Sequence, residues 1–187
     1  NLTWTSPAGW SGPVVPSSVT GTNTYGTLYT SPTTTYVDGA IVNTGDLASG
    51  SFYVDFYLDG VTYLGRTSVG SISPGGQSYI QDFPTSVSTT GSHYVQMRID
   101  ATNLVSEQSE SDNTVNSPNL TWSVAPVDIV IDQVTVTPLS PLVGGTVDIA
   151  VTIRNAGPGN VTSNFYVDFY QNRSSPPPLG TPGDASQ

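Results

Sequence analysis

A six-residue segment, Phe-Tyr-Val-Asp-Phe-Tyr, occurs twice in this chain, at residues 52–57 and 165–170. The residues before it also correspond, because Ile-Val-Asn-Thr-Gly at 41–45 matches Ile-Arg-Asn-Ala-Gly at 153–157 in three of five positions. Six identical residues in a row are not expected by chance. The chain is therefore predicted to contain successive copies of one structural unit.

The tetrapeptide Asn-Leu-Thr-Trp is repeated as well, at 1–4 and 119–122, and we interpret the two copies as matching lead-ins to successive units. This divides the chain into residues 1–118, which open with a lead-in rich in Thr, Pro and Gly, and residues 119–187. After the second hexapeptide only a Pro- and Gly-rich tail follows, so we expect one complete unit and the first half of a second. A half-built unit exposes a strand edge and half a core. Either the tandem array continues beyond this chain, or the second unit is completed in trans.

The local pattern is that of an all-β protein, with no helix expected. Short runs rich in Val, Ile, Thr, Tyr and Phe are separated by Gly, Pro, Asn and Asp, which is typical of a sandwich or a barrel. Asp59-Gly60, between two such runs, predicts a hairpin turn. The strands are expected at 36–43, 51–58, 61–67, 77–83 and 92–100, with a last strand and linker near 113–124, and in the second unit at 128–137, 146–154 and 164–170.

Strand alternation divides the duplicated hexapeptide and its continuation into two faces. The residues expected to face the core are Phe52, Val54, Phe56 and Leu58. Those expected to face outward are Tyr53, Asp55, Tyr57 and Asp59. The outward tyrosines, with Tyr166 and Tyr170 in the second copy, suit an ordinary solvated sheet face, an interface with a neighbouring unit or subunit, or a platform on which sugars stack.

Charge excludes several classes of partner. The chain has 14 acidic residues and four basic ones, all arginine, for a formal net charge of −10. Nucleic acids and anionic membrane surfaces require a basic patch, so neither is an expected partner. Cysteine and lysine are both absent, which excludes disulfides and Lys–Asn isopeptide cross-links within the chain. Since no apolar run approaches the roughly 20 residues of a membrane-spanning helix, membrane insertion is not expected.

The sequence carries no recognisable catalytic or cofactor motif. His93 is the single histidine, and its place in a predicted strand favours a structural role over that of a catalytic base. Nucleophile-elbow, zinc-protease, dinucleotide-binding and EF-hand patterns do not occur. We therefore expect neither enzymatic activity nor an organic cofactor.

One acidic group is a candidate metal site. Asp100, Glu107, Glu110 and Asp112 lie close together in sequence, beside Asn113. Hard oxygen ligands at this spacing are of the kind that binds Ca²⁺ in a loop between strands. The alternative is purely structural: these side chains accept hydrogen bonds from loop N–H groups and hold the final hairpin in place.

Four sequons for N-glycosylation are present, at Asn1, Asn119, Asn160 and Asn172. Asn1 and Asn119 belong to the repeated tetrapeptide, so they count as one observation. Asn160 and Asn172 lie in predicted exposed loops and are the better candidates.

The order of several short motifs resembles the CARDB family, the cell-adhesion-related, immunoglobulin-like module of bacterial and archaeal surface proteins. The motifs are Asn43-x-Gly45, the segment 52–60, Ile72-x-Pro74-Gly75, Gly91-x-His93-Tyr94-Val95, Ile99-Asp100 and Val105-x-Glu107-x-x-Glu110-x-Asp112-Asn113. The resemblance covers residues 36–115, and 128–170 as the first half of a second copy, whereas residues 5–35 depart from it. It implies a seven-stranded immunoglobulin-like β-sandwich in a surface or secreted protein, without catalytic activity.

These observations lead to a functional hypothesis. The chain is expected to be a non-enzymatic, extracellular structural or adhesive protein, a segment of a tandem immunoglobulin-like array in a cell-surface fibre or filament. Its expected partners are neighbouring copies of itself or adjacent repeats, and cell-surface glycans are a further candidate. Strand exchange is the suggested assembly mechanism, with segment 1–35 of one chain completing the second unit of another. The alternative is a carbohydrate-binding or spacer module of a secreted hydrolase, with Trp4, Trp10 and Trp122 supplying the aromatic surface.

Overall fold

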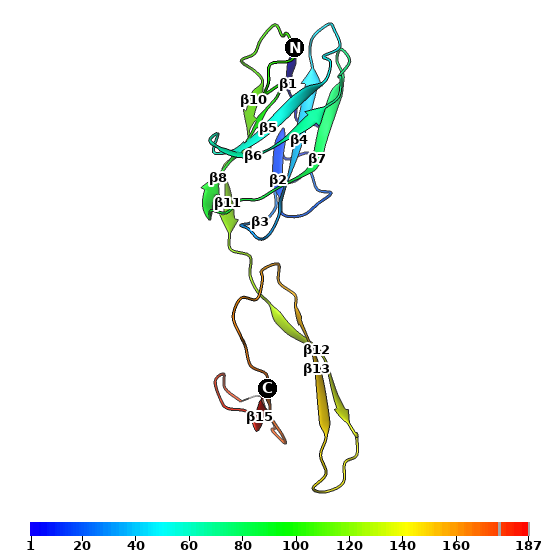
Figure 1. The fold of residues 1–187 in the computed structure, drawn as a ribbon, viewed down its shortest axis with the longest axis vertical. Coiled ribbons are helices and arrows are strands. Elements are labelled where there is room, and N and C mark those ends of the chain that lie inside the picture. The colour runs from blue at the N-terminus through cyan, green and yellow to red at the C-terminus, as the bar shows by residue number, and fades with distance from the viewer. Residues whose placement is uncertain (176, 187) are drawn as a thin grey trace.

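The computed structural model of the protein describes residues 1–175 and 177–186 (Figure 1). These residues form strands, turns and loops without a helix, which confirms the predicted all-β class. The strands are β1 (Leu2–Trp4), β2 (Val14–Ser17), β3 (Leu28–Tyr29), β4 (Thr35–Asn43), β5 (Phe52–Leu58), β6 (Thr62–Val69), β7 (Gln77–Thr85), β8 (Gly91–His93), β9 (Val95–Arg98), β10 (Thr114–Asn116), β11 (Leu120–Ser123), β12 (Ile129–Thr137), β13 (Asp148–Asn155), β14 (Asp168–Phe169) and β15 (Ala185–Ser186).

The first unit is an immunoglobulin-like β-sandwich, as expected. In one sheet β4 is central, with β1 and β2 paired to the two halves of one edge and β7 to the other edge. The second sheet has the order β10-β9-β5-β6. A short sheet with the order β3-β11-β8 lies at one end, and β8 leads directly into β9. Alternating apolar residues on the inner faces explain why the two sheets pack together.

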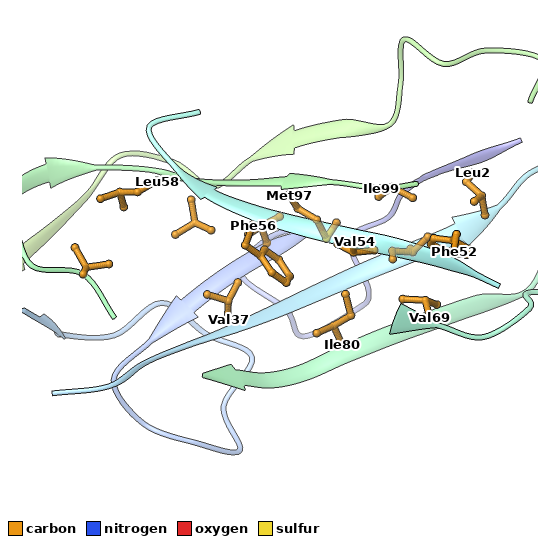
Figure 2. Packing of buried hydrophobic residues seen from close by; sticks show 14 of the residues in the cluster. Leu2, Val37, Phe52, Val54, Phe56, Leu58, Val69, Ile80, Met97 and Ile99 are labelled. Atoms are coloured by element: carbon orange, nitrogen blue, oxygen red, sulfur yellow. The ribbon is translucent and has the colours of Figure 1, made fainter. Parts of the chain in front are cut away.

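The core lies between the two sheets (Figure 2). Phe52, Val54 and Phe56 of β5 are at most 1% exposed and face β4 and β7, as the alternation predicted. Met97 reaches across from β9 to Gly39, where a Cβ atom would collide with its sulfur. The remaining buried apolar residues of this cluster are Leu2, Val14, Leu28, Val37, Ile41, Leu58, Val69, Ile72, Ile80, Val87, Val95, Ile99 and Trp122.

The lead-in of the first unit contributes strands of its own to the sandwich. Residues 5–35 depart from the motifs of the family, yet the lead-in 1–35 contains β1, β2 and β3. Leu2, Val14 and Val15 are not exposed at all, and Leu28 is 1% exposed. Short apolar stretches between Thr, Pro and Gly are enough to form these strands, because β4 supplies the edge with which β1 and β2 pair. The proposed role of segment 1–35 as the donor strand for another chain is therefore wrong, since these residues fill their own core.

The two Asn-Leu-Thr-Trp segments occupy different places, so the interpretation as equivalent lead-ins is not correct. Leu2–Trp4 is the first strand, and Trp4 is 43% exposed. Leu120–Ser123 instead pairs antiparallel with β8 and parallel with β3, and Trp122 is 1% exposed in the first unit's core. The indole Nε1 of Trp122 donates to Thr35 Oγ1 at 3.2 Å. The first unit therefore continues past Pro118, to Ser123.

The second unit is built around the β12–β13 hairpin, which stands apart from the sandwich in Figure 1. Its register shifts between Ile131 and Gln133. This bulge allows Ile131 and the later Val134 and Val136 to share one face, although their spacing would otherwise place them on opposite faces. The predicted strand at 164–170 is present only as Asp168–Phe169, so the second hexapeptide does not form a strand along its length.

A repeated asparagine interaction shows how the two units correspond. Asn43 Oδ1 accepts from Gly45 N at 3.0 Å and from the amino group of Asn1 at 3.4 Å. Asn155 Oδ1 accepts from Gly157 N at 3.1 Å and from Asp128 N at 3.0 Å. Asp128 therefore takes the place of Asn1, and β12 begins one residue later at Ile129, as β1 begins at Leu2. The segment before it connects the units.

The described residues contain no helix long and apolar enough to cross a membrane.

Candidate functional site

The outward face of β5 is organised by an ion pair. Arg66 on β6 donates to both carboxylate oxygens of Asp55, Nε to Oδ1 at 2.6 Å and a terminal nitrogen to Oδ2 at 2.8 Å. This hydrogen-bonded carboxylate also raises the pKa of the Arg66 guanidinium above its usual value. Asp55 points outward as predicted but is only 3% exposed, because the Arg66 side chain covers it. Strand alternation predicted correctly that the Asp55 side chain points outward, whereas its burial depends on the cross-strand partner Arg66.

The two outward tyrosines of β5 each contact an arginine. The Arg66 guanidinium lies 5.3 Å from the ring centre of Tyr53, which is 40% exposed. The guanidinium of Arg98, on β9, lies 3.9 Å from the ring centre of Tyr57. Tyr63 on β6 packs edge-on against Tyr57, with ring centres 5.5 Å apart. We call Tyr53, Tyr57, Tyr63, Arg66 and Arg98 the Tyr–Arg face.

The corresponding tyrosines of the second copy do not form such a face. Tyr166 is 82% exposed and lies outside any strand. Tyr170 donates its hydroxyl to the carbonyl of Thr181, and Arg173 lies 5.4 Å from its ring centre. The pairing of tyrosine with arginine thus recurs, although the sheet that carries it in the first unit is not formed in the second.

The β12–β13 hairpin presents an apolar face without a covering layer. Val134 pairs with Val151, and Val136 with Ile149; Val134 and Ile149 are 54% and 42% exposed. The equivalent positions on β4 belong to the core, where Val37 and Ile41 are not exposed at all. Among the described residues β13 pairs only with β12, so the edge that β4 uses to pair with β7 is open in β13.

The acidic loop after β9 is held by hydrogen bonds to the chain around it. Asp100 accepts from the N–H groups of Leu104 and Val105, at 2.9 and 2.8 Å. Glu107 accepts from Leu2 N and, at 2.9 Å, from Asn113 Nδ2. Of the four carboxylates predicted as a calcium site, Glu107 and Asp112 hold the loop against Leu2 and Asn1, whereas Asp100 bonds within the loop and Glu110 accepts from Asn113.

The same loop offers a limited test of metal binding. Burial raises the pKa of Glu107, and its hydrogen bonds lower it in part. Asp112 Oδ1 and Asn113 Oδ1 are buried and have no partner among the described residues. Within residues 1–175 and 177–186, however, no group of three or more acidic or histidine side chains is arranged to hold a metal ion. Calcium binding by Asp100, Glu107, Glu110 and Asp112 stays a prediction.

His93 has a structural environment, as expected for a strand residue. Its Nδ1 lies 2.6 Å from Asp59 Oδ2, and its ring packs edge-on against Trp122 at 6.0 Å. Burial alone would raise the pKa of Asp59, but hydrogen bonds from His93 and from the Tyr94 N–H hold that pKa below its usual value. The pair joins the β5–β6 turn to β8.

The four sequons differ in accessibility. Asn119, Asn160 and Asn172 are exposed. The Asn1 side chain is engaged instead, because its Nδ2 donates to Asp112 Oδ2 at 3.0 Å and its Oδ1 accepts from Ser109 N at 3.0 Å. Glycosylation at Asn119, Asn160 and Asn172 stays a prediction, and Asn1 would have to leave the acidic loop to be modified.

An aromatic pair on the other sheet was not anticipated. Trp10 and Tyr79 lie with ring centres 5.6 Å apart, and Tyr79 is 49% exposed. The Tyr79 hydroxyl donates to Gln77 Oε1 at 2.6 Å. Nearly seventy positions separate the two aromatic residues, so the sequence offered no signal for their contact.

The comparison with known families agrees with this architecture. The CARDB family model matches residues 18–117, just over half of the chain. The chain belongs to the CARDB family. The match falls within the first unit and includes the Tyr–Arg face and the acidic loop.

Two solved structures are similar to this CARDB chain. One is the crystal structure of the CARDB domain of a Pyrococcus furiosus protein, described as a complex with di-metal ions; it is 18% identical, with a TM-score of 0.47 over 66% of this chain and 94% of that one. Another is the solution structure of a domain of a Methanosarcina acetivorans protein described as a candidate cell-surface protein. It is 24% identical, with a TM-score of 0.44 over 51% of this chain and 82% of that one. No curated protein matches the chain by sequence.

Proposed function

We propose that this CARDB protein is a non-enzymatic, extracellular structural or adhesive segment of a tandem array, and that its second unit is completed by strand exchange between chains at the cell surface. The observation that carries the proposal is the β12–β13 hairpin. Its strands repeat the start of the first unit, while its core face and one edge are open. An extended segment that pairs along β13 would satisfy the free backbone groups and cover the apolar residues together.

Two further observations support a structural role. Several carboxylates of the first unit accept hydrogen bonds from loop N–H groups, an arginine and a histidine, which are stabilising contacts. Exposed sequons and an acidic surface suit a secreted protein. The family resemblance to cell-adhesion-related modules points the same way.

The proposal is tested by molar mass in solution as a function of protein concentration, using light scattering after size exclusion. Val151→Lys places a charge on the apolar face of β13, and Thr152→Lys places the same charge on its other face. We expect the wild-type chain and Thr152→Lys to form regular polymers and Val151→Lys to remain monomeric, because a buried ammonium opposes docking on the hairpin. A wild-type chain that stays monomeric, or equal polymerisation of both variants, would contradict strand exchange.

A carbohydrate-binding module is the second candidate, and the Trp10–Tyr79 pair favours it. Neighbouring aromatic rings with polar groups beside them can stack on a sugar and orient it. Trp4, on β1, and the buried Trp122, on β11, belong to different sheets and do not form one exposed surface. Binding on a glycan array that disappears in Trp10→Ala would support this function over strand exchange.

A further inference from the structure

The turn between β5 and β6 and the loop before β8 meet at the single histidine of the chain. His93 Nδ1 lies 2.6 Å from Asp59 Oδ2, and the other ring nitrogen, Nε2, lies 3.3 Å from the hydroxyl oxygen of Thr89. The three side chains therefore form a continuous hydrogen-bonded series, from a carboxylate through an imidazole to a hydroxyl. This is the order of groups that activates a hydroxyl as a nucleophile in acyl transfer.

The carboxylate determines which ring nitrogen of His93 carries the proton. Asp59 Oδ1 also accepts from the Tyr94 N–H at 3.0 Å. Burial alone would raise the pKa of Asp59, but the bonds from His93 and from the Tyr94 N–H hold that pKa below its usual value. An ionised carboxylate only accepts hydrogen bonds, so the proton of a neutral His93 ring belongs on Nδ1. Nε2 then carries a lone pair and accepts from the Thr89 hydroxyl, as a general base does.

The base is held in place while the hydroxyl stays accessible. The His93 side chain is 17% exposed, and its ring packs against Trp122, which is 1% exposed. Thr89 is exposed, and the loop that carries it is fixed at Val87, whose carbonyl accepts from Ser31 N at 2.7 Å. An external reagent can therefore reach the hydroxyl without displacing its base.

The backbone around Thr89 leaves room for a reacting carbonyl group. Gly91 has a φ of 123°, and a Cβ atom there would lie 3.8 Å from His93 Nε2. The glycine thus keeps a side chain away from the nitrogen that accepts the proton. In the part of the chain that the structure describes, the N–H groups of Thr89 and Thr90 have no protein acceptor. They can donate to the oxyanion that forms when the hydroxyl attacks a carbonyl carbon.

We propose that Thr89 is a covalent modification site, whose hydroxyl takes the acyl group of a carboxylic ester with His93 as the general base. A bond forms between Thr89 Oγ1 and the carbonyl carbon, and the bond from that carbon to the alkoxy oxygen breaks. The hydroxyl proton passes to His93 Nε2 and then to the departing alkoxide, which leaves as an alcohol. An ester is the fitting donor, because an alkoxide leaves more readily than the nitrogen of an amide. Thr89 and His93 are the catalytic residues of this step, and Asp59 is a positioning residue.

The test treats the full 187-residue chain with p-nitrophenyl acetate and follows the released nitrophenolate by absorbance. The chain has neither lysine nor cysteine, so few other side chains compete for the acetyl group. Trypsin cleavage after Arg66 and Arg98 releases residues 67–98, in which tandem mass spectrometry locates the acetyl group. We expect a rapid phase of nitrophenolate release, stoichiometric with the protein, and an acetyl group on Thr89.

Variants of the exposed loop separate the nucleophile from its neighbour. Thr89→Val should abolish the rapid phase and Thr89→Ser should retain it, whereas Thr90→Val should behave as the wild-type chain does. His93→Gln should slow acylation about a hundredfold, as expected for the loss of a general base. Asp59→Asn should slow it too and remove the preference for the Nδ1–H form, which nitrogen NMR of the single histidine reports.

Acylation of Thr89 goes beyond the proposed function and does not depend on strand exchange. A rapid phase of equal size in Thr89→Val, or acetyl groups confined to the amino terminus and tyrosines, would overturn the inference. So would a wild-type chain that reacts no faster when folded than in urea, a comparison that does not depend on how any variant folds. Acylation followed by steady release of nitrophenolate would support the inference and contradict the proposed non-enzymatic role. Acylation of a chain that stays monomeric would support it and contradict strand exchange alone.

Discussion

At the scale of single residues, the first unit is stabilised where buried polar side chains find partners that are distant in sequence. Asn43 is not exposed, and its Nδ2 donates to the carbonyls of Leu47 and Ile72 at 2.8 and 2.9 Å. It connects β4 to two loops and to the start of β1. The Asn-x-Gly sequence signals a local turn, but only the structure shows that one asparagine unites these four segments.

Replacing this asparagine tests its contribution. We expect Asn43→Ala to lower the free energy of unfolding of the first unit by about 2–3 kcal/mol, because the carbonyls of Leu47 and Ile72 lose their donor and the bond to Ile72 is buried. Urea denaturation followed by tryptophan fluorescence measures the change. Asn155→Ala, which removes the equivalent side chain of the second unit, should leave that transition unchanged, and equal effects of the two variants would contradict this account.

Asp38 predicts a pH dependence of stability. Burial raises the pKa of its carboxyl and the nearby Asp82 adds to the effect, while the hydrogen bond from Asp82 N–H opposes it. Because the folded-state pKa lies above the unfolded one, the folded protein binds more protons in the interval between them. The contribution of Asp38 to stability therefore decreases as pH rises through that interval.

The Asp38→Asn variant isolates this effect, since an amide oxygen can still accept from Asp82 N–H. We expect the urea midpoint of Asp38→Asn to vary less with pH, above the usual aspartate range, than that of the wild-type chain. Asp46→Asn, at an exposed position, should keep the wild-type slope. A slope unchanged in Asp38→Asn would show that burial of this carboxyl does not govern the pH dependence.

At the scale of strands, alternation predicted the main elements well and the partners of these elements poorly. The strands expected at 36–43 and 51–58 are found as β4 and β5, because each needs one apolar face for the same core. The burial of Asp55 and the stacking of Arg98 on Tyr57 depend on the register of β5 with β6 and with β9, which no local pattern specifies. The second hexapeptide shows the same limit. The same six residues form a strand along their whole length in the first unit, where β6 and β9 pair with them, but only Asp168–Phe169 is a strand in the second.

The repeated tetrapeptide yields a direct test at this scale. We expect Trp122→Ala to lower the free energy of unfolding by about 3–5 kcal/mol, because a buried indole leaves a cavity and Thr35 loses its partner. Trp4→Ala, at 43% exposure, should cost less than about 1 kcal/mol. Thermal and urea unfolding of the two variants provide the comparison. Similar losses would mean that the two tetrapeptides play equivalent roles after all.

At the scale of the whole molecule, a closed sandwich is followed by a hairpin that has the pattern of a core strand pair but lacks a core. The contrast between Val37, with no exposure, and its counterpart Ile149, 42% exposed, defines the unfinished surface. The closed first unit buries its own core, and the open hairpin is the surface on which the proposed strand exchange would take place. Under the proposed function, strand exchange along β13 would join such chains into a surface array.

Amide hydrogen exchange of β13 tests the central claim most directly. Within a two-stranded hairpin, about half of the β13 N–H groups point toward β12 and the others toward the open edge. We predict that the edge-facing amides exchange rapidly in dilute protein and become protected at the concentrations where molar mass increases. Edge-facing amides that keep exchanging rapidly in the assembled protein would contradict completion of the second unit by a strand from another chain.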